Sequence, residues 1–151
     1  MTQIPRAPLI LGLAGVLPFV WGVATLLSPT LFSWVTGTLG GRFVGPFVML
    51  DYGQVILAFM SGVIWGFATR STGSTAALGY GLSVVPALWA FFMVGSGPTT
   101  SAINLIFGFA GVLGLDWLFW RHGIAPEWWL TLRLILTAIV IACLFVPAFL
   151  L

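Results

Sequence analysis

The sequence predicts an all-α membrane protein, a bundle of five transmembrane helices with the N-terminus inside and the C-terminus outside. Hydrophobic residues make up 60% of the 151 residues and charged residues only 5%, whereas a soluble domain has about 25% charged residues. Five apolar stretches each approach the roughly 20 residues that a membrane-spanning helix needs. Continuous runs of this length favour helices over a β-barrel, whose strands are segments of about 10 residues with alternating polarity.

The chain is expected to form one integral membrane domain over residues 1–151. The predicted spans are residues 9–27, 47–68, 76–94, 102–120 and 127–150. Arg6 precedes the first apolar run, as in a signal peptide. That run is longer than the usual core of about 7–15 residues, and no A-x-A-like cleavage site follows it. We therefore expect it to be retained as the first span.

Polar, glycine and proline residues separate the predicted spans. Residues 28–46 form the longest connection, for which two structures are open. One is a short helix in the membrane interface, with Ser28 as N-cap and Pro29 at the first helical position. The other is an apolar loop packed on the ends of the spans. The later breaks fall at residues 70–74, 95–98 and 121–126.

Helix packing inside the membrane is expected to rely on small residues, because lipid tails are as apolar as leucine and drive little association. Small residues form rows on three spans: Ala58, Gly62 and Gly66; Gly79, Ser83 and Ala87; Gly108, Gly111 and Gly114. We expect Asp51, Gln54 and Gly62 to face other helices. Pro18, Pro86 and Pro147 lie within spans and are expected to kink them.

The arginines predict the orientation. Arg6, Arg70, Arg121 and Arg133 fall on the N-terminal side of the membrane, and Arg42 falls on the other. Positive residues are enriched on the cytoplasmic side, so the N-terminus is predicted to lie inside. The tryptophans around the last inner loop agree, since these rings favour the headgroup region.

The second span carries the first candidate site, a polar intramembrane stripe. Its members are Asp51, Gln54, Ser61 and Trp65, with Asn104 of the fourth span at a similar depth. One interpretation is an ion or proton site that faces a cavity. The other is a buried packing face, with Asp51 paired to Arg42 or capping a helix end, and with Asn104 bonded to Gln54.

The second candidate site is a cluster at the inner interface. Its members are Asp116, Arg121, Glu127, Trp128 and Arg133. Asp116 and Arg133 lie at matching depth on consecutive spans, so we expect them to form an ion pair. Glu127 suits the positive N-terminal end of the fifth helix. The cluster is either a site for a headgroup, ligand or partner, or an ion-paired hairpin that fixes the fold.

Little in the sequence indicates catalysis. The chain has one histidine, His122, and one cysteine, Cys143, inside an apolar run. They make neither a persuasive catalytic triad nor a zinc site, and no phosphate-binding loop or dinucleotide fingerprint occurs. We therefore expect a protein that is not an enzyme, with no cofactor or metal and no nucleic-acid partner.

Several segments resemble a known family. They are residues 52–68 (YGQVILAFMSGVIWGFA), 83–94 (SVVPALWAFFMV) and 125–137 (APEWWLTLRLILT), with Asp116 and residues 8–18. The chain is similar along nearly its full length to the transmembrane protein 69-like family, domain of unknown function 3429. The resemblance implies a small multi-span protein and brings no assigned activity. Where family members often have a polar residue before the WG pair, this chain has Ile64.

Three functions remain open from the sequence. The first is a non-enzymatic membrane protein that acts through partners, such as an accessory or assembly subunit of an inner-membrane complex. The second is a small-solute or ion pathway formed by a homo-oligomer. The third is lipid or quinone binding at the Trp-rich inner interface. The expected partners are membrane lipids and other membrane subunits or further copies of the chain. A bacterial inner membrane is the expected location, because no Ser/Arg-rich transit segment is recognisable.

Overall fold

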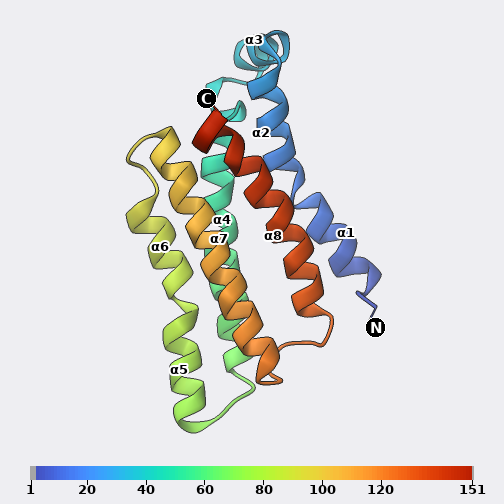
Figure 1. Cartoon of the computed structure of the whole chain (residues 1–151), viewed down its shortest axis with the longest axis vertical. Coiled ribbons are helices and arrows are strands. Elements are labelled where there is room, and N and C mark those ends of the chain that lie inside the picture. Colours follow the sequence, from blue (N-terminus) through green and yellow to red (C-terminus); the bar gives the residue numbers. More distant parts are fainter. Residues whose placement is uncertain (1–2, 151) are drawn as a thin grey trace.

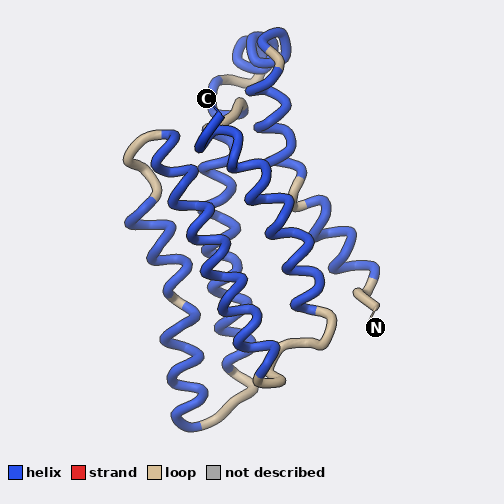
Figure 2. Tube along the Cα trace, in the orientation of Figure 1, coloured by secondary structure: helices blue, strands red, loops and turns tan. Residues whose placement is uncertain are grey.

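Five helical segments long and apolar enough to span a membrane make up the fold (Figures 1 and 2). The computed structural model describes residues 3–150, and no strand occurs within that range. The segments are Arg6–Leu27, Phe47–Ala68, Gly73–Met93, Pro98–Arg121 and Trp129–Leu150. The predicted all-α class and the five membrane-length helices are confirmed. The side of the membrane on which the N-terminus lies stays a prediction.

Three of the segments are broken beside a proline, as predicted. The first divides into α1 (Arg6–Ala14) and α2 (Leu17–Leu27), and the third into α5 (Gly73–Ser83) and α6 (Val85–Met93). Pro18 and Pro86 occupy the second positions of α2 and α6. The fifth segment changes from α8 (Trp129–Phe145) to a π-helical turn, η2 (Val146–Leu150), which contains Pro147. Proline has no N–H to donate and its ring crowds the preceding turn, so a regular helix cannot continue through it undistorted.

The long connection after the first segment contains a helix. α3 (Pro29–Thr38) begins where predicted, and the Ser28 hydroxyl accepts a hydrogen bond from the Leu31 N–H at 3.3 Å. In Figure 1 α3 is seen nearly end-on, so it runs across the bundle axis. A 3₁₀ turn, η1 (Gly41–Phe43), follows it. The Trp21 indole N–H donates to the Phe43 carbonyl at 2.8 Å, which ties this turn to α2.

The centre of the bundle is formed by α4 (Phe47–Ala68) and α7 (Pro98–Arg121). α4 contacts α2, α5, α6 and α7. α7 contacts α4, α6, α8 and η2. Most of the core is one apolar cluster, which includes Phe19, Met49, Leu57, Leu105, Phe109 and Leu144. Gly108 lets α7 approach closely, because a Cβ there would lie 2.7 Å from Leu57 Cδ1 and 3.0 Å from Trp89 Cδ1.

The prediction for the small-residue row on α4 is wrong. Ala58, Gly62 and Gly66 are all exposed. Within residues 3–150, no atom of another helix lies within 4 Å of a Cβ built on Gly62 or Gly66. The face that packs is instead the one that carries Gly53 and Leu57, where the large apolar side chains are buried. Burial of large side chains, not the spacing of small ones, sets the rotation of α4.

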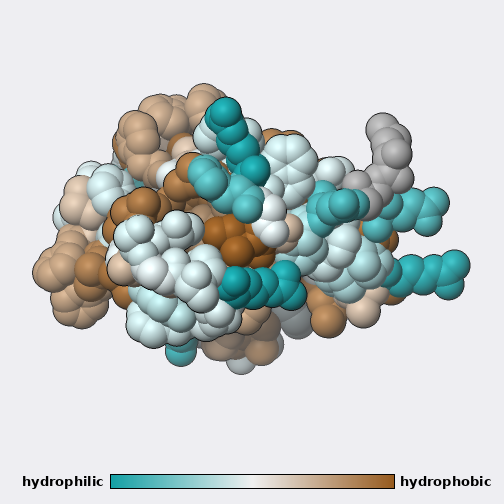
Figure 3. Space-filling model, turned by 90° about the horizontal axis from the view of Figure 1, so that it is seen from below, coloured by the Kyte–Doolittle hydropathy of each residue, from teal (hydrophilic) through white to brown (hydrophobic). Residues whose placement is uncertain are grey.

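The two ends of the bundle differ in charge. In Figure 1 the α4–α5 turn and the α7–α8 connection lie at the lower end, and the start of α1 lies in the lower half. Arg6, Arg70, Arg121 and Glu127 are exposed there. Figure 3 looks at this lower end and shows hydrophilic side chains projecting around hydrophobic surface. Arg42 lies at the other end, on η1. The predicted orientation rests on this unequal distribution of arginines between the two ends.

Candidate functional site

The polar stripe on α4 begins with an ion pair at the upper end of the bundle. The Arg42 Nε donates to Asp51 Oδ2 at 3.0 Å. The Arg42 side chain is 74% exposed, and the Asp51 side chain is 49% exposed. Asp51 is therefore exposed and not buried against other helices, which corrects that expectation. Its pairing with Arg42, one of the alternatives predicted for it, is confirmed. Such an exposed pair contributes little to stability.

The other members of the stripe do not converge on a common space. The Ser61 hydroxyl accepts the Ala87 N–H at 2.8 Å, a donor that lies next to Pro86 at the break between α5 and α6. The Asn104 amide donates to the Met93 carbonyl at 2.6 Å, so it bonds to the end of α6 and not to Gln54. Trp65 is half exposed and packs on Tyr80, and Gln54 is partly buried. These contacts hold helices and connections together.

The inner cluster contains a tight buried group, as predicted for Asp116 and Arg133. The Arg133 Nε donates to Asp116 Oδ2 at 2.7 Å, and the Trp129 indole N–H donates to Asp116 Oδ1 at 2.8 Å. Asp116 is fully buried and Arg133 is 5% exposed. A carboxylate with both oxygens bonded is well satisfied in an apolar environment. This group joins α7 to the first two turns of α8.

The remaining members of that cluster lie outside the buried group. Arg121 is exposed and stacks over the Trp117 ring at 5.1 Å. Glu127 is exposed, and its backbone carbonyl accepts the Trp120 indole N–H at 3.1 Å. Trp128 packs against Trp129 and faces a cavity. The predicted cluster therefore divides into a buried triad and a surface rim.

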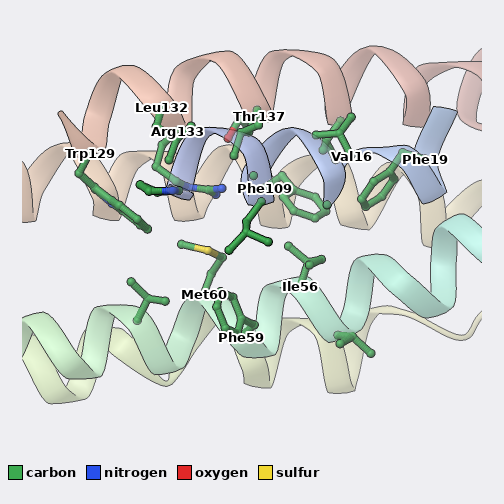
Figure 4. Close-up of a pocket in the computed structure, with 18 of the residues that line it drawn as sticks. Val16, Phe19, Ile56, Phe59, Met60, Phe109, Trp129, Leu132, Arg133 and Thr137 are labelled. Atoms are coloured by element: carbon green, nitrogen blue, oxygen red, sulfur yellow. The ribbon is translucent and has the colours of Figure 1, made fainter. Parts of the chain in front are cut away.

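A cavity adjoins the buried group on α8 (Figure 4). Its volume is about 520 Å³, and α1, α2, α4, α7 and α8 contribute to its walls. This volume falls within the roughly 300–1,000 Å³ of small-molecule sites. Three exposed lining residues, Leu11 of α1 with Val55 and Phe59 of α4, mark its mouth. The cavity therefore opens on the side of the bundle, between α1 and α4.

Arg133 and Thr137 of α8 interrupt a mostly apolar wall, whose other polar side-chain groups belong to Tyr52, Trp128 and Trp129. Arg133 and Thr137 both line the cavity, and Figure 4 shows them projecting from α8 on the side opposite Met60 and Ile56. The Arg133 Nη2 and the Thr137 hydroxyl are buried and have no hydrogen-bond partner among the described residues. Such groups are costly in an apolar interior and are rare in folded proteins. Their position on a cavity wall indicates a place for a ligand.

Comparison with known proteins decides the family. The family model described as "Protein of unknown function (DUF3429)" matches residues 4–149. The chain belongs to the DUF3429 family.

A relative of this DUF3429 protein is "Transmembrane protein 69" of Xenopus tropicalis, which is 33% identical over 145 residues. The match covers 93% of this chain and 53% of the relative, so the chain spans about half the length of that curated protein. No solved structure matches the chain. The predicted family is confirmed, and this DUF3429 protein is a multi-pass membrane protein of unknown function.

Sequence reasoning missed two polar residues of this candidate site. Trp129 and Thr137 stand four residues before and after Arg133, so all three share one face of α8. That spacing could have identified both once Arg133 was expected to point inward. The cavity itself leaves no such pattern, because its walls are apolar residues of several helices.

Proposed function

We propose that this protein binds a lipid-like molecule inside the membrane, in the cavity between α1, α2, α4, α7 and α8. The observation that carries the proposal is the buried Arg133, whose Nη2 has no partner within residues 3–150 and which lines a mostly apolar cavity. An ionisable residue within a membrane-spanning helix marks a functional site by default. The opening of the cavity between α1 and α4 supports entry of such a molecule from the bilayer. This is the sequence-derived alternative of lipid or quinone binding near the inner interface.

The test is to identify what the protein retains after purification in mild detergent. Organic extraction followed by mass spectrometry should find about one lipid-like molecule per chain, enriched over the bulk membrane lipids. Val63→Trp places a large ring in the cavity that Val63 lines and should abolish this enrichment. Val20→Trp is the matched control, because Val20 is exposed on α2 and lies outside the cavity wall.

An extract with the composition of the bulk membrane, unchanged by Val63→Trp, would show the proposal to be wrong. Loss of the molecule in both variants would also count against it, since Val20→Trp leaves the cavity open.

A non-enzymatic role through protein partners is the second candidate, as an accessory or assembly subunit. The short connections favour it: α7 and α8 are joined by residues 122–128, and α4 and α5 by residues 69–72. The same purification would reveal such partners as stable co-purifying subunits. We propose a bacterial inner membrane as the location. The arginine bias supports an N-terminus on the inner side of that membrane. The relative from Xenopus tropicalis is a eukaryotic protein.

A pathway for an ion or small solute has less support. Asp51, Ser61 and Asn104 would line it, and each is bonded to another group of the same chain.

A further inference from the structure

The polar groups of the cavity restrict the chemistry of a ligand bound there. The Arg133 guanidinium uses its Nε on Asp116, which leaves Nη2 to donate. Guanidinium nitrogens only donate hydrogen bonds. Thr137 lies one helical turn further along the same face of α8, and its hydroxyl can donate as well. The complement to this wall is therefore an oxygen that accepts hydrogen bonds.

The charges at the site favour an uncharged acceptor. The Asp116 carboxylate already balances the Arg133 guanidinium at 2.7 Å. Arg133 is the one charged residue among the described residues that line the cavity. A carboxylate or phosphate placed there would leave one uncompensated negative charge in a medium of low dielectric constant, which is unfavourable. A carbonyl oxygen offers two lone pairs without this penalty.

The apolar walls extend far beyond these polar groups. The lining residues of α4 run from Tyr52 to Phe67, fifteen residue steps along the helix. At about 1.5 Å per residue this distance is about 22 Å. Half of a bilayer core of about 30 Å is about 15 Å. The cavity therefore has room for an apolar tail longer than one leaflet is thick.

We infer that the cavity binds a neutral molecule with a carbonyl group and a long apolar tail, whose carbonyl oxygen accepts hydrogen bonds from Arg133 Nη2 and the Thr137 hydroxyl. This inference rests on the proposed function and adds the ligand class to it. The shared chemistry has two natural sources, the ring carbonyl of an isoprenoid quinone and the ester carbonyl of a neutral glycerolipid.

Three probes separate these sources from an anionic ligand. Full-length protein, freed of bound lipid by detergent exchange, is titrated with menaquinone bearing four isoprene units, with dioleoylglycerol, or with oleate at a pH at which its carboxylate is ionised. A ligand that binds only the folded protein raises the melting temperature in proportion to its affinity. We expect at least one neutral probe to bind at least tenfold more tightly than oleate. The neutral probe that binds more tightly identifies the source.

The variants of Thr137 test the hydrogen bond itself. Thr137→Val keeps the shape of the side chain and removes the hydroxyl, so the neutral probe should bind about tenfold more weakly, the effect of losing about 1.4 kcal/mol. Thr137→Ser restores a hydroxyl and should recover most of the affinity. Val20→Trp should leave the affinity unchanged, because Val20 lies outside the cavity wall.

The possible results distinguish the two proposals. Binding of oleate as tight as that of the neutral probes, or an unchanged affinity in Thr137→Val, would overturn the inference about the carbonyl but leave a lipid-binding cavity. If no probe raises the melting temperature, and extraction of the freshly purified protein finds nothing that Val63→Trp removes, the proposed function fails as well.

Discussion

At the scale of single residues, the buried group on Asp116 combines stability with an unused donor. Both carboxylate oxygens are occupied, one by Trp129 and one by Arg133. The guanidinium has more N–H donors than the bond to Asp116 uses. Its Nη2 lies against the cavity and has no partner among the described residues. A lysine could pair with Asp116 but could not present a second planar N–H group in the same fixed geometry.

The ion pair can be tested by a double-mutant cycle. Asp116→Asn and Arg133→Gln should each lower the free energy of unfolding by about 3 kcal/mol or more, because each leaves an uncompensated buried charge. The double variant should lose less than the sum of the single losses. Thermal denaturation in detergent measures all four proteins. Strict additivity would mean that the two side chains do not interact.

Removal of the Thr137 hydroxyl is expected to have the opposite effect on stability. Thr137→Val should stabilise the ligand-free protein by about 1 kcal/mol, because it removes a buried polar group that has no partner within residues 3–150. Thr25→Val is the control. The Thr25 hydroxyl donates to the Gly22 carbonyl and accepts from the Gly45 N–H, each at 2.8 Å. Its loss should destabilise by a similar amount. A lower melting temperature in the empty Thr137→Val protein would indicate that this hydroxyl is bonded within the protein.

Residue-level prediction succeeded where two charges had to meet inside the membrane. Asp116 and Arg133 are both costly alone in hydrocarbon, and their depths match, so their pairing could be expected. The polar residues of α4 did not follow this logic. The Ser61 hydroxyl accepts a hydrogen bond from the Ala87 backbone N–H, beside the helix break at Pro86. No pattern of side chains in the sequence specifies such a backbone partner.

At the scale of helices, the breaks followed the prolines and the rotations did not follow the small residues. Pro18, Pro86 and Pro147 act locally, through a missing N–H and a bulky ring. The rotation of a helix depends on every neighbour it packs against. For this reason the exposed row of Ala58, Gly62 and Gly66 was misassigned, whereas Gly53 and Gly108 support the close contacts.

Two glycine variants test that assignment. Gly108→Leu should lower the free energy of unfolding by about 1–3 kcal/mol or more, because its side chain would overlap Leu57 and Trp89. Gly62→Leu is the matched control and should leave the melting temperature nearly unchanged, since its Cβ meets no other helix within residues 3–150. Equal losses in the two variants would mean that Gly62 also packs closely, as in an assembly of several chains.

At the scale of the whole molecule, the number of membrane-length helices could be predicted because span length and hydropathy are local properties. The cavity could not, because it depends on how α1 and α2 lean against α8 and α4 after the break near Gly15. The orientation in the membrane is a further whole-molecule property, and it rests on the arginine distribution.

Cysteine labelling tests that orientation. In a Cys143→Ser background, single cysteines at Ser71 and His122 should react only with reagents that reach the inside, whereas one at Ser96 should react from outside. Outside-accessible thiols at both Ser71 and His122 would reverse the predicted topology.

The side mouth between α1 and α4 determines which concentration governs binding. A molecule that enters there travels in the plane of the membrane, so the relevant quantity is its number per lipid molecule and not its amount per volume of water. Diluting proteoliposomes with buffer should leave the occupancy of the cavity unchanged, whereas fusing them with empty vesicles should lower it. In a cell, the fraction of occupied protein would then follow the composition of the membrane.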